Sequence, residues 1–209
     1  MSPLVLDAAP SGVDMTRSIF LEAMGPRPLD EFDGSLPVDA QMKGRRAVVD
    51  LGGWGRREHT TAAVDAGVEL WHVLGYGLDH LDLPYLLDHG VQVAHTPGSC
   101  SAVALAEHAM LLTLAAIRSL GDQERNLREK VFYLPWSEEL DGKTLLLVGV
   151  GASGIELARR ANAFGMVVTG VDLRRPNESI TGAVGISRVE PASRLPEMLP
   201  EADVVSLHL

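Results

Sequence analysis

Short apolar runs, many of them rich in β-branched residues, alternate with helical patterns along the 209 residues of the chain. The runs predict strands over Leu4–Asp7, Ala47–Leu51, Leu70–Leu74, Val91–His95, Thr144–Val148, Val167–Val171 and Val204–Leu207. The patterns between them predict helices such as Met15–Met24, Arg56–Ala66, Leu81–His89 and Ile155–Phe164. Strand, helix and strand in repeated order indicate parallel sheets with helices on both faces. The predicted fold class is therefore α/β.

One long helix is expected from Ser101 to about Lys130. Ser101 is suited to be its N-cap because it follows the helix-breaking pair Pro97-Gly98 closely. Apolar residues from Val103 to Leu120 fall on nearly every face, so we expect this helix to contact protein on all sides. Such a helix can pass between two domains.

The length of the chain allows two α/β units, and we place their boundary near residue 100. The predicted domains are residues 1–100 and residues 101–209. Within the second domain, the Gly- and Pro-bearing segment Arg174–Gly185 is interpreted as a connecting loop.

Charge and cysteine content narrow the classes of partner. The 18 basic and 28 acidic side chains give a net charge of −10, without the basic excess that a nucleic-acid binder needs. Cys100 is the only cysteine, so the chain forms no internal disulfide, which suits a reducing cytoplasm. We expect Cys100 to be a small buried residue; the alternative is a thiol activated by the N-terminus of the long helix.

The sequence predicts neither a membrane-spanning segment nor a metal site. The first residues lack the basic start and long apolar run of a signal peptide. The most apolar stretch, Ala102–Ile117, is interrupted by Glu107 and His108 and is too short to span a bilayer. The seven histidines lie on separate predicted elements without metal-binding spacing. We therefore expect a cytoplasmic protein without a membrane, nucleic-acid or metal partner.

The most specific motif is G-x-G-x-x-G at Gly149, Gly151 and Gly154, which follows an apolar strand and opens a helix. In a dinucleotide-binding loop the first glycine permits a tight turn, the second lets the backbone approach a diphosphate, and the third lets helix pack on strand. The diphosphate then lies at the helix N-terminus, where free N–H groups favour an anion. The alternative is a glycine turn that merely joins strand to helix.

Asp172 ends the next strand, 18 residues past Gly154, where an acidic side chain can accept hydrogen bonds from both hydroxyls of the adenosine ribose. A carboxylate about 4 Å from a 2′-phosphate is disfavoured by roughly 1–4 kcal/mol, so we predict NAD rather than NADP. Arg174 and Arg175 follow, however, and can partly offset that repulsion by pairing with a phosphate.

Several segments together resemble the D-isomer-specific 2-hydroxyacid dehydrogenases. They are Leu74–Asp82, Gly90–Gly98, Ala104–His108, Leu140–Thr144, Ala163–Met166 and Ala202–His208. The resemblance runs from about residue 45 to the last residue. It implies a flavodoxin-like first domain, a Rossmann second domain, and transfer of a hydride between NAD(P) and the carbinol carbon of a 2-hydroxy acid.

The resemblance also implies a substrate site. Backbone amides of the segment Leu74, Gly75, Tyr76 and Gly77 are expected to hold the substrate carboxylate, because glycines let the chain expose successive N–H groups to an anion. The alternative for this segment is a simple turn at a strand end. His95 stands where the family often has asparagine.

For the cofactor, the resemblance adds further positions to the motif. The expected cofactor-binding residues are Gly149, Gly151, Ala152, Ser153, Gly154, Asp172, Arg174, His208 and Leu209. The family often has Arg-Ile where this chain has Ala152-Ser153, and the Ser153 hydroxyl can replace the donor lost with the arginine. His208 and Leu209 end the strand near where the adenine would lie, and packing is the preferred role for both.

The family's catalytic arginine, glutamate and histidine follow the segment that matches Ser206–His208, so none is expected in this chain. Thr144–Val148, Val167–Val171 and Val204–Leu207 are interpreted as strands 1, 2 and 3 of a doubly wound sheet, which leaves strand 1 as an exposed edge. We therefore interpret the chain as a fragment of a longer protein, with an incomplete Rossmann domain and no turnover of its own.

Two other functions stay open beside the dehydrogenase. One is a non-catalytic NAD-binding interaction protein of the corepressor type, and the other is a truncated product that folds poorly. The expected partners of the dehydrogenase are a small 2-hydroxy or 2-oxo acid and a second copy of the chain. The resemblance implies that this homodimer packs through the long-helix region.

Overall fold

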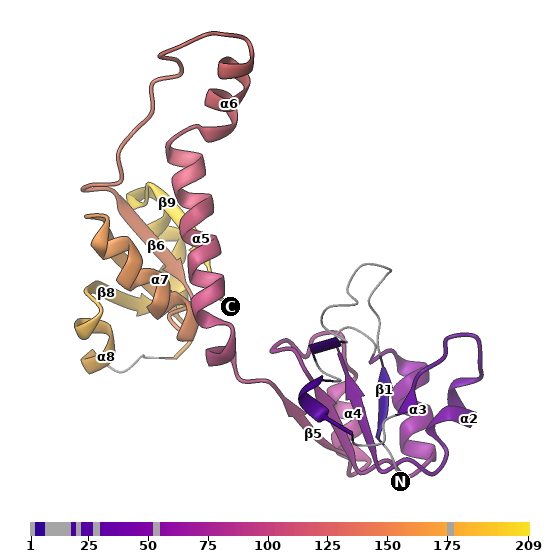
Figure 1. The fold of residues 1–209 in the computed structure, drawn as a ribbon. Helices are drawn as coiled ribbons and strands as arrows, with labels where there is room; N and C mark the ends of the chain where they lie inside the picture. The colour runs from indigo at the N-terminus through magenta and orange to yellow at the C-terminus, as the bar shows by residue number, and fades with distance from the viewer. Residues whose placement is uncertain (1–2, 7–17, 20–21, 27–29, 52–54, 175–177) are drawn as a thin grey trace. The chain divides into compact units, whose positions relative to one another are not determined.

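The computed structural model describes residues 3–6, 18–19, 22–26, 30–51, 55–174 and 178–209. The helix expected over Met15–Met24 and the strand end at Asp7 lie largely outside the described residues. The chain divides into two compact units, residues 1–97 and residues 98–209, and each unit has its own sheet (Figure 1).

The first unit is a sheet of five parallel strands. Their bounds are β1 Leu4–Leu6, β2 Asp30–Glu31, β3 Ala47–Asp50, β4 Leu70–Val73 and β5 Gln92–His95. They lie in the order β2-β1-β3-β4-β5, which is the flavodoxin-like order expected from the resemblance. The helices are α2 Val38–Met42, α3 Arg57–Asp65 and α4 Leu83–Asp88.

Buried and partly buried side chains alternate along two strands of this unit, and the buried apolar ones belong to its core. In β3 and β4 every second residue is buried, because successive side chains of a strand point to opposite faces of the sheet. Trp71 of β4 is fully buried and packs in one cluster with Met42 of α2 and Leu86 of α4. α4 begins at Asp82, whose carboxylate accepts a hydrogen bond from the Tyr85 amide at 3.3 Å.

The second unit is a sheet of four parallel strands. Their bounds are β6 Thr144–Val148, β7 Val167–Asp172, β8 Ile186–Pro191 and β9 Val204–Leu207, in the order β8-β7-β6-β9. The helices are α5 Ala102–Ile117, α6 Leu120–Arg128, α7 Ala152–Ala163, α8 Glu178–Ala183 and α9 Leu195–Met198. Single 3₁₀ turns cover Gly98–Cys100, Ala192–Arg194 and Leu199–Glu201.

Both faces of this sheet are covered, as a doubly wound fold requires. Leu145 and Leu147 of β6 pack in one cluster with Leu157 of α7, on the face that α5 also covers (Figure 1). Leu146 of the same strand packs on the other face with Met198 of α9. The predicted α/β class, with a Rossmann second unit, is therefore confirmed.

The predicted numbering of the strands is wrong. Val204–Leu207 pairs with β6 on the side away from β7, so it is the fourth strand of the Rossmann order and not the third. The third strand is β8, which pairs in parallel with β7 and was not predicted from the sequence. β6 is therefore an interior strand, and the exposed edge expected there does not exist.

The segment Arg174–Gly185 is also more than a connecting loop, because it contains α8. β8 was not predicted because its sequence has no apolar run. It is an edge strand, and its residues Ser187 and Arg188 are exposed.

The single long helix expected from Ser101 to Lys130 is two helices. Ser119 adopts a left-handed conformation (φ 50°), which ends α5, and α6 continues at an angle of 57°. Ser101 is the N-cap residue of α5, but its side chain makes no capping hydrogen bond. In the described part of the chain, no single helix is long and apolar enough to cross a membrane, and α5 with α6 reaches that length and composition only as a bent pair.

Within the second unit alone, one face of α5 is buried, so the predicted contact of its other faces with protein stays a prediction. Its buried face is formed by Ala102, Ala106, Met110 and Thr113. Leu105, Leu111 and Leu112, on other faces, are each more than half exposed. Cys100 is exposed as well, because it lies in a 3₁₀ turn ahead of α5 and not within a packed element, so the buried role predicted for it is wrong.

Candidate functional site

The three glycines of the motif lie where β6 passes into α7. Gly149 has φ +97°, and a Cβ there would collide with the carbonyl oxygen of His208. A Cβ on Gly154 would lie 2.5 Å from the Gly149 carbonyl oxygen. Around a Cβ on Gly151 there is nothing within 4 Å. Two glycines are thus required by packing, while the third leaves open space over the backbone.

That open space lies at a helix N-terminus. Gly151 is the N-cap residue of α7, whose 12 residues run away from the loop. The first N–H groups of a helix have no intrahelical acceptor, and the helix dipole favours an anion beside them. β6 and β9 flank the loop, which places it where the strand order reverses, the position at which doubly wound sheets bind ligands. The arrangement fits a dinucleotide diphosphate.

Asp172, at the end of β7, is bound to this loop. Its Oδ2 accepts a hydrogen bond from the Val150 amide at 2.7 Å, and its Oδ1 accepts one from the Arg174 amide at 2.8 Å. Each carboxylate oxygen can accept more than one hydrogen bond, so both remain able to accept ribose hydroxyls. The two backbone bonds hold the carboxylate beside the glycine loop.

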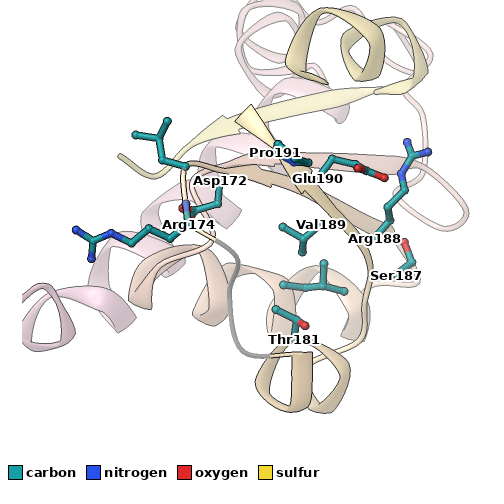
Figure 2. A pocket seen from close by; sticks show the side chains of 10 residues that line it. Asp172, Arg174, Thr181, Ser187, Arg188, Val189, Glu190 and Pro191 are labelled. Atoms are coloured by element: carbon teal, nitrogen blue, oxygen red, sulfur yellow. The ribbon is translucent and has the colours of Figure 1, made fainter. Parts of the chain in front are cut away.

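A cavity of about 320 Å³ opens beside Asp172 and is lined by the end of β7, by Thr181 of α8 and by the length of β8 (Figure 2). Its polar lining includes Thr181, Arg188 and Glu190. Figure 2 shows the side chains of Arg174 and Arg188 extending to opposite sides. Arg188 pairs with Glu201 at 2.7 Å. Arg174 is exposed and is therefore accessible to a phosphate near Asp172.

His208 lies against the glycine loop. Its amide donates to the Val148 carbonyl at 2.7 Å, which carries the pairing of β6 and β9 one residue further. Its Nδ1 lies 3.0 Å from Ser153 Oγ, and its Nε2 lies 3.0 Å from Ser206 Oγ. Burial disfavours the charged imidazolium and lowers the pKa of His208.

The structure therefore brings Gly149, Gly151, Ser153, Gly154 and His208 together, and it attaches Asp172 to the same loop through Val150. Ala152 begins α7 directly beside them. Leu209 is 88% exposed, so the packing role preferred for it is wrong in this structure.

The second candidate site is the segment Leu74–Gly77, which follows β4 in the first unit. Its carbonyl groups are held by two residues at the end of β5. The Thr96 hydroxyl donates to the Leu74 carbonyl at 3.1 Å and the Thr96 amide to the Gly75 carbonyl at 3.1 Å. His95 Nδ1 lies 3.0 Å from the Tyr76 carbonyl oxygen and must carry a proton, because a carbonyl only accepts.

Most amides of this segment, unlike its carbonyls, have no hydrogen-bond partner among the described residues. The Leu74 amide donates to the Asp50 carbonyl at 2.8 Å. It is therefore not free to bind the substrate carboxylate, contrary to the prediction for this residue. Within the described residues, the amides of Gly75, Tyr76 and Gly77 have no acceptor. Neither glycine has a neighbouring atom within 3.9 Å of its Cβ position, so the backbone is accessible. Successive free amides of this kind bind anions.

A buried acid that was not predicted from the sequence lies next to this segment. The carboxylate of Asp50, at the end of β3, is fully buried, and its Oδ2 lies 3.2 Å from His80 Nε2. Asp50 therefore contacts the chain on both sides of the segment: its backbone carbonyl accepts from the Leu74 amide, and its side chain contacts His80, three residues after Gly77. An acid that ends an apolar run was the available signal. In the described part of the chain, no three His, Cys, Asp or Glu side chains are grouped to hold a metal ion.

Known proteins resemble this chain in sequence and in structure. Residues 110–209 match the family model described as the D-isomer specific 2-hydroxyacid dehydrogenase NAD binding domain. A hydroxypyruvate reductase of Thermotoga maritima is 34% identical over 158 residues, covering 72% of this chain and 47% of that protein. A glyoxylate reductase of Thermofilum pendens is 31% identical over 139 residues, covering 64% of this chain and 40% of that protein.

A solved structure extends the likeness to the whole chain. The D-lactate dehydrogenase of Aquifex aeolicus, crystallised with NAD and lactic acid, has a TM-score of 0.81 and 25% identity, covering 99% of this chain and 60% of that one. The chain belongs to the D-isomer-specific 2-hydroxyacid dehydrogenase family, and NAD is its cofactor. It spans less than half the length of the two curated relatives above.

Proposed function

We propose that this protein is an oxidoreductase that transfers a hydride between NAD and the carbinol carbon of a D-2-hydroxy acid. In the oxidative direction that carbon loses a hydride and its hydroxyl loses a proton, which leaves a 2-oxo acid. NAD, when bound, accepts the hydride. The unit of residues 1–97 holds the substrate, and the unit of residues 98–209 holds the dinucleotide.

The observation that carries this proposal is the set of free amides at Gly75, Tyr76 and Gly77. Every 2-hydroxy or 2-oxo acid bears a carboxylate beside its reacting carbon. Amides that bind this carboxylate therefore place the reacting carbon close by, without contacting the rest of the molecule. The relatives named as hydroxypyruvate reductase and glyoxylate reductase support a small 2-oxo acid as substrate.

The resemblance assigns none of its catalytic arginine, glutamate and histidine to these 209 residues, so we propose that they bind both ligands without turning them over. The test is NADH oxidation with glyoxylate, pyruvate and hydroxypyruvate. It is measured on this chain and on the product of any reading frame that continues past Leu209. Turnover only by the longer product is the expected result. Turnover by the 209 residues would contradict the assignment of the catalytic groups.

We also propose that the protein is a homodimer. Its surface would be the apolar patch on α5, α6 and the segment that follows α6. Figure 1 shows α6 and that segment beyond the end of the second unit's sheet. The exposed members of the patch are Leu111, Leu112, Leu120, Leu127, Phe132, Tyr133 and Trp136. A contiguous apolar patch on a protein surface marks an interaction site, and a two-fold dimer buries one patch against itself.

Light scattering coupled to size exclusion tests the dimer. Twice the mass of one chain is expected, falling to one chain when Leu112 and Trp136 are both replaced by serine. A monomeric mass for the unmodified chain would contradict the proposal. No separate observation favours the corepressor-type interaction protein.

A further inference from the structure

His208 connects an edge of the second sheet to the glycine loop. Ser206, whose hydroxyl lies 3.0 Å from Nε2, belongs to β9. Ser153, whose hydroxyl lies 3.0 Å from Nδ1, belongs to the first turn of α7. All three side chains are partly buried, which strengthens these bonds relative to bonds on the open surface.

The direction of these hydrogen bonds follows from counting donors and acceptors. A neutral imidazole has one N–H group and one bare nitrogen. Within the described residues, Nε2 is the acceptor within reach of the Ser206 hydroxyl, so we assign the tautomer in which Nε2 is bare and accepts from Ser206. Nδ1 then carries the proton and donates to Ser153. The hydrogen of the Ser153 hydroxyl is left without an acceptor in the described part of the protein.

We propose that His208 and Ser206 are positioning residues that direct the Ser153 hydroxyl as a hydrogen-bond donor to the diphosphate of NAD. The inference rests on the cofactor half of the proposed function. Ser153 lies two residues after Gly151, over which the space is open, and on the helix end that favours an anion. The opposite arrangement, with the proton on Nε2, would turn a hydroxyl lone pair toward the diphosphate.

The same geometry makes the affinity for NAD depend on pH. A charged imidazolium donates to both serines and adds a positive charge near the diphosphate, so protonation of His208 strengthens binding. Because burial lowers the pKa of His208, the strengthening is expected below the ordinary titration range of histidine. Among the described residues that line the cavity beside His208, His108 of α5 is the other titratable group. Asp172 is the charged group on the opposite side of the loop.

A double-mutant cycle tests whether Ser206 acts through Ser153. The dissociation constant of NAD is measured by calorimetry for the unmodified chain, Ser153→Ala, Ser206→Ala and the double variant. We expect about a tenfold weakening for Ser153→Ala and about a threefold weakening for Ser206→Ala, since hydrogen bonds to charged groups are the stronger class. In the Ser153→Ala background, Ser206→Ala should add nothing, because the hydroxyl that it directs is gone.

Three controls separate this effect from a general loss of structure. Ser137→Ala, in the loop before β6, should leave the affinity for NAD unchanged. Ser206→Thr keeps the hydroxyl and should restore the affinity lost in Ser206→Ala. Between pH 6.5 and 4.5 the unmodified chain should bind NAD more tightly as pH falls, because the pKa of His208 is lowered. His208→Asn should bind with little change over the same range, and His108→Asn should behave like the unmodified chain.

Each other outcome counts against the inference. Equal affinity in Ser153→Ala and the unmodified chain would show that the hydroxyl is not a donor to NAD. An additive loss in the double variant would show that Ser206 does not act through Ser153. If the unmodified chain does not bind NAD, both the cofactor half of the proposed function and the inference are overturned. That outcome can be told apart from the two above, because in those the unmodified chain still binds NAD.

Discussion

The Tyr76 carbonyl oxygen accepts a hydrogen bond from His95 Nδ1, at 3.0 Å, across 19 residues of sequence. Together with the bonds from Thr96, it fixes the carbonyls of the segment after β4 on the side of β5. A peptide plane that points its carbonyl one way points its amide the other way. The end of β5 therefore decides where the free amides of the candidate carboxylate site point.

His95→Ala should weaken the binding of a small carboxylate to this site. With the Tyr76 carbonyl released, its peptide can rotate, and we expect the dissociation constant of pyruvate to rise about three- to tenfold. An NMR titration that follows the amides of Gly75 and Gly77 measures it. His95→Asn is the matched control, because an asparagine amide can donate to the same carbonyl. An equal loss in both variants would mean that the imidazole has another role.

Asp172→Ala should weaken the binding of NAD and reduce the preference for NAD over NADP. It removes two acceptors from the loop, those that hold the amides of Val150 and Arg174, and it removes the charge that repels a 2′-phosphate. We expect the affinity for NAD to fall at least tenfold, with Arg174 free to attract NADP. Calorimetry with both dinucleotides measures the change.

Asp203→Ala is the control for this experiment. Asp203 holds the Thr144 amide at 2.8 Å, at the opposite end of β6, so its loss should lower stability without changing the choice of cofactor. If Asp172→Ala binds NADP no better relative to NAD, the carboxylate does not determine the choice.

Replacement by alanine should have different effects at two glycines of the motif: at one it should lower stability, and at the other it should lower the affinity for NAD. Gly154→Ala places a methyl group 2.5 Å from the Gly149 carbonyl oxygen, so we expect about 1–3 kcal/mol of lost stability. Gly151→Ala meets nothing within 4 Å, so the fold should persist while the methyl group obstructs the diphosphate and NAD affinity falls. Urea unfolding and calorimetry separate the two effects.

The control for the stability measurement is Gly182→Ala in α8, where a Cβ also meets no neighbour within 4 Å. It should leave stability unchanged or raise it slightly, since alanine favours a helix. Loss of stability in Gly151→Ala as large as in Gly154→Ala would contradict the open space assigned to Gly151.

Buried His59 should make the protein less stable in mild acid. Burial lowers the pKa of its imidazole, an effect that Glu58 partly opposes. A histidine whose folded pKa is depressed contributes stability that is present above its unfolded pKa and is lost as pH falls toward the folded value. Urea unfolding at pH 7.5 and 5.5 should therefore show a fall in the free energy of unfolding that is smaller in His59→Asn. Exposed His89, replaced in the same way, should leave the fall unchanged.

Strands that are mainly apolar runs were predictable from the sequence, both the interior strand β6 and the edge strand β9. Thr144–Val148 and Val204–Leu207 have their predicted bounds, since apolar β-branched runs have few other stable states. The glycine spacing and the acid at Asp172 marked the dinucleotide loop, because the backbone approach to a diphosphate restricts side chains locally. These features depend on neighbours in sequence, and the sequence alone was enough for them.

The order of the strands and the direction of the polar groups were decided by tertiary structure. Nothing local tells that Val204–Leu207 lies on one side of β6 while the exposed edge strand β8 lies beside β7. Nor does it tell that His95 faces Tyr76 or that His208 lies between Ser153 and Ser206. Such pairings join residues far apart in the chain, and only the packing of whole elements brings their atoms within hydrogen-bond distance.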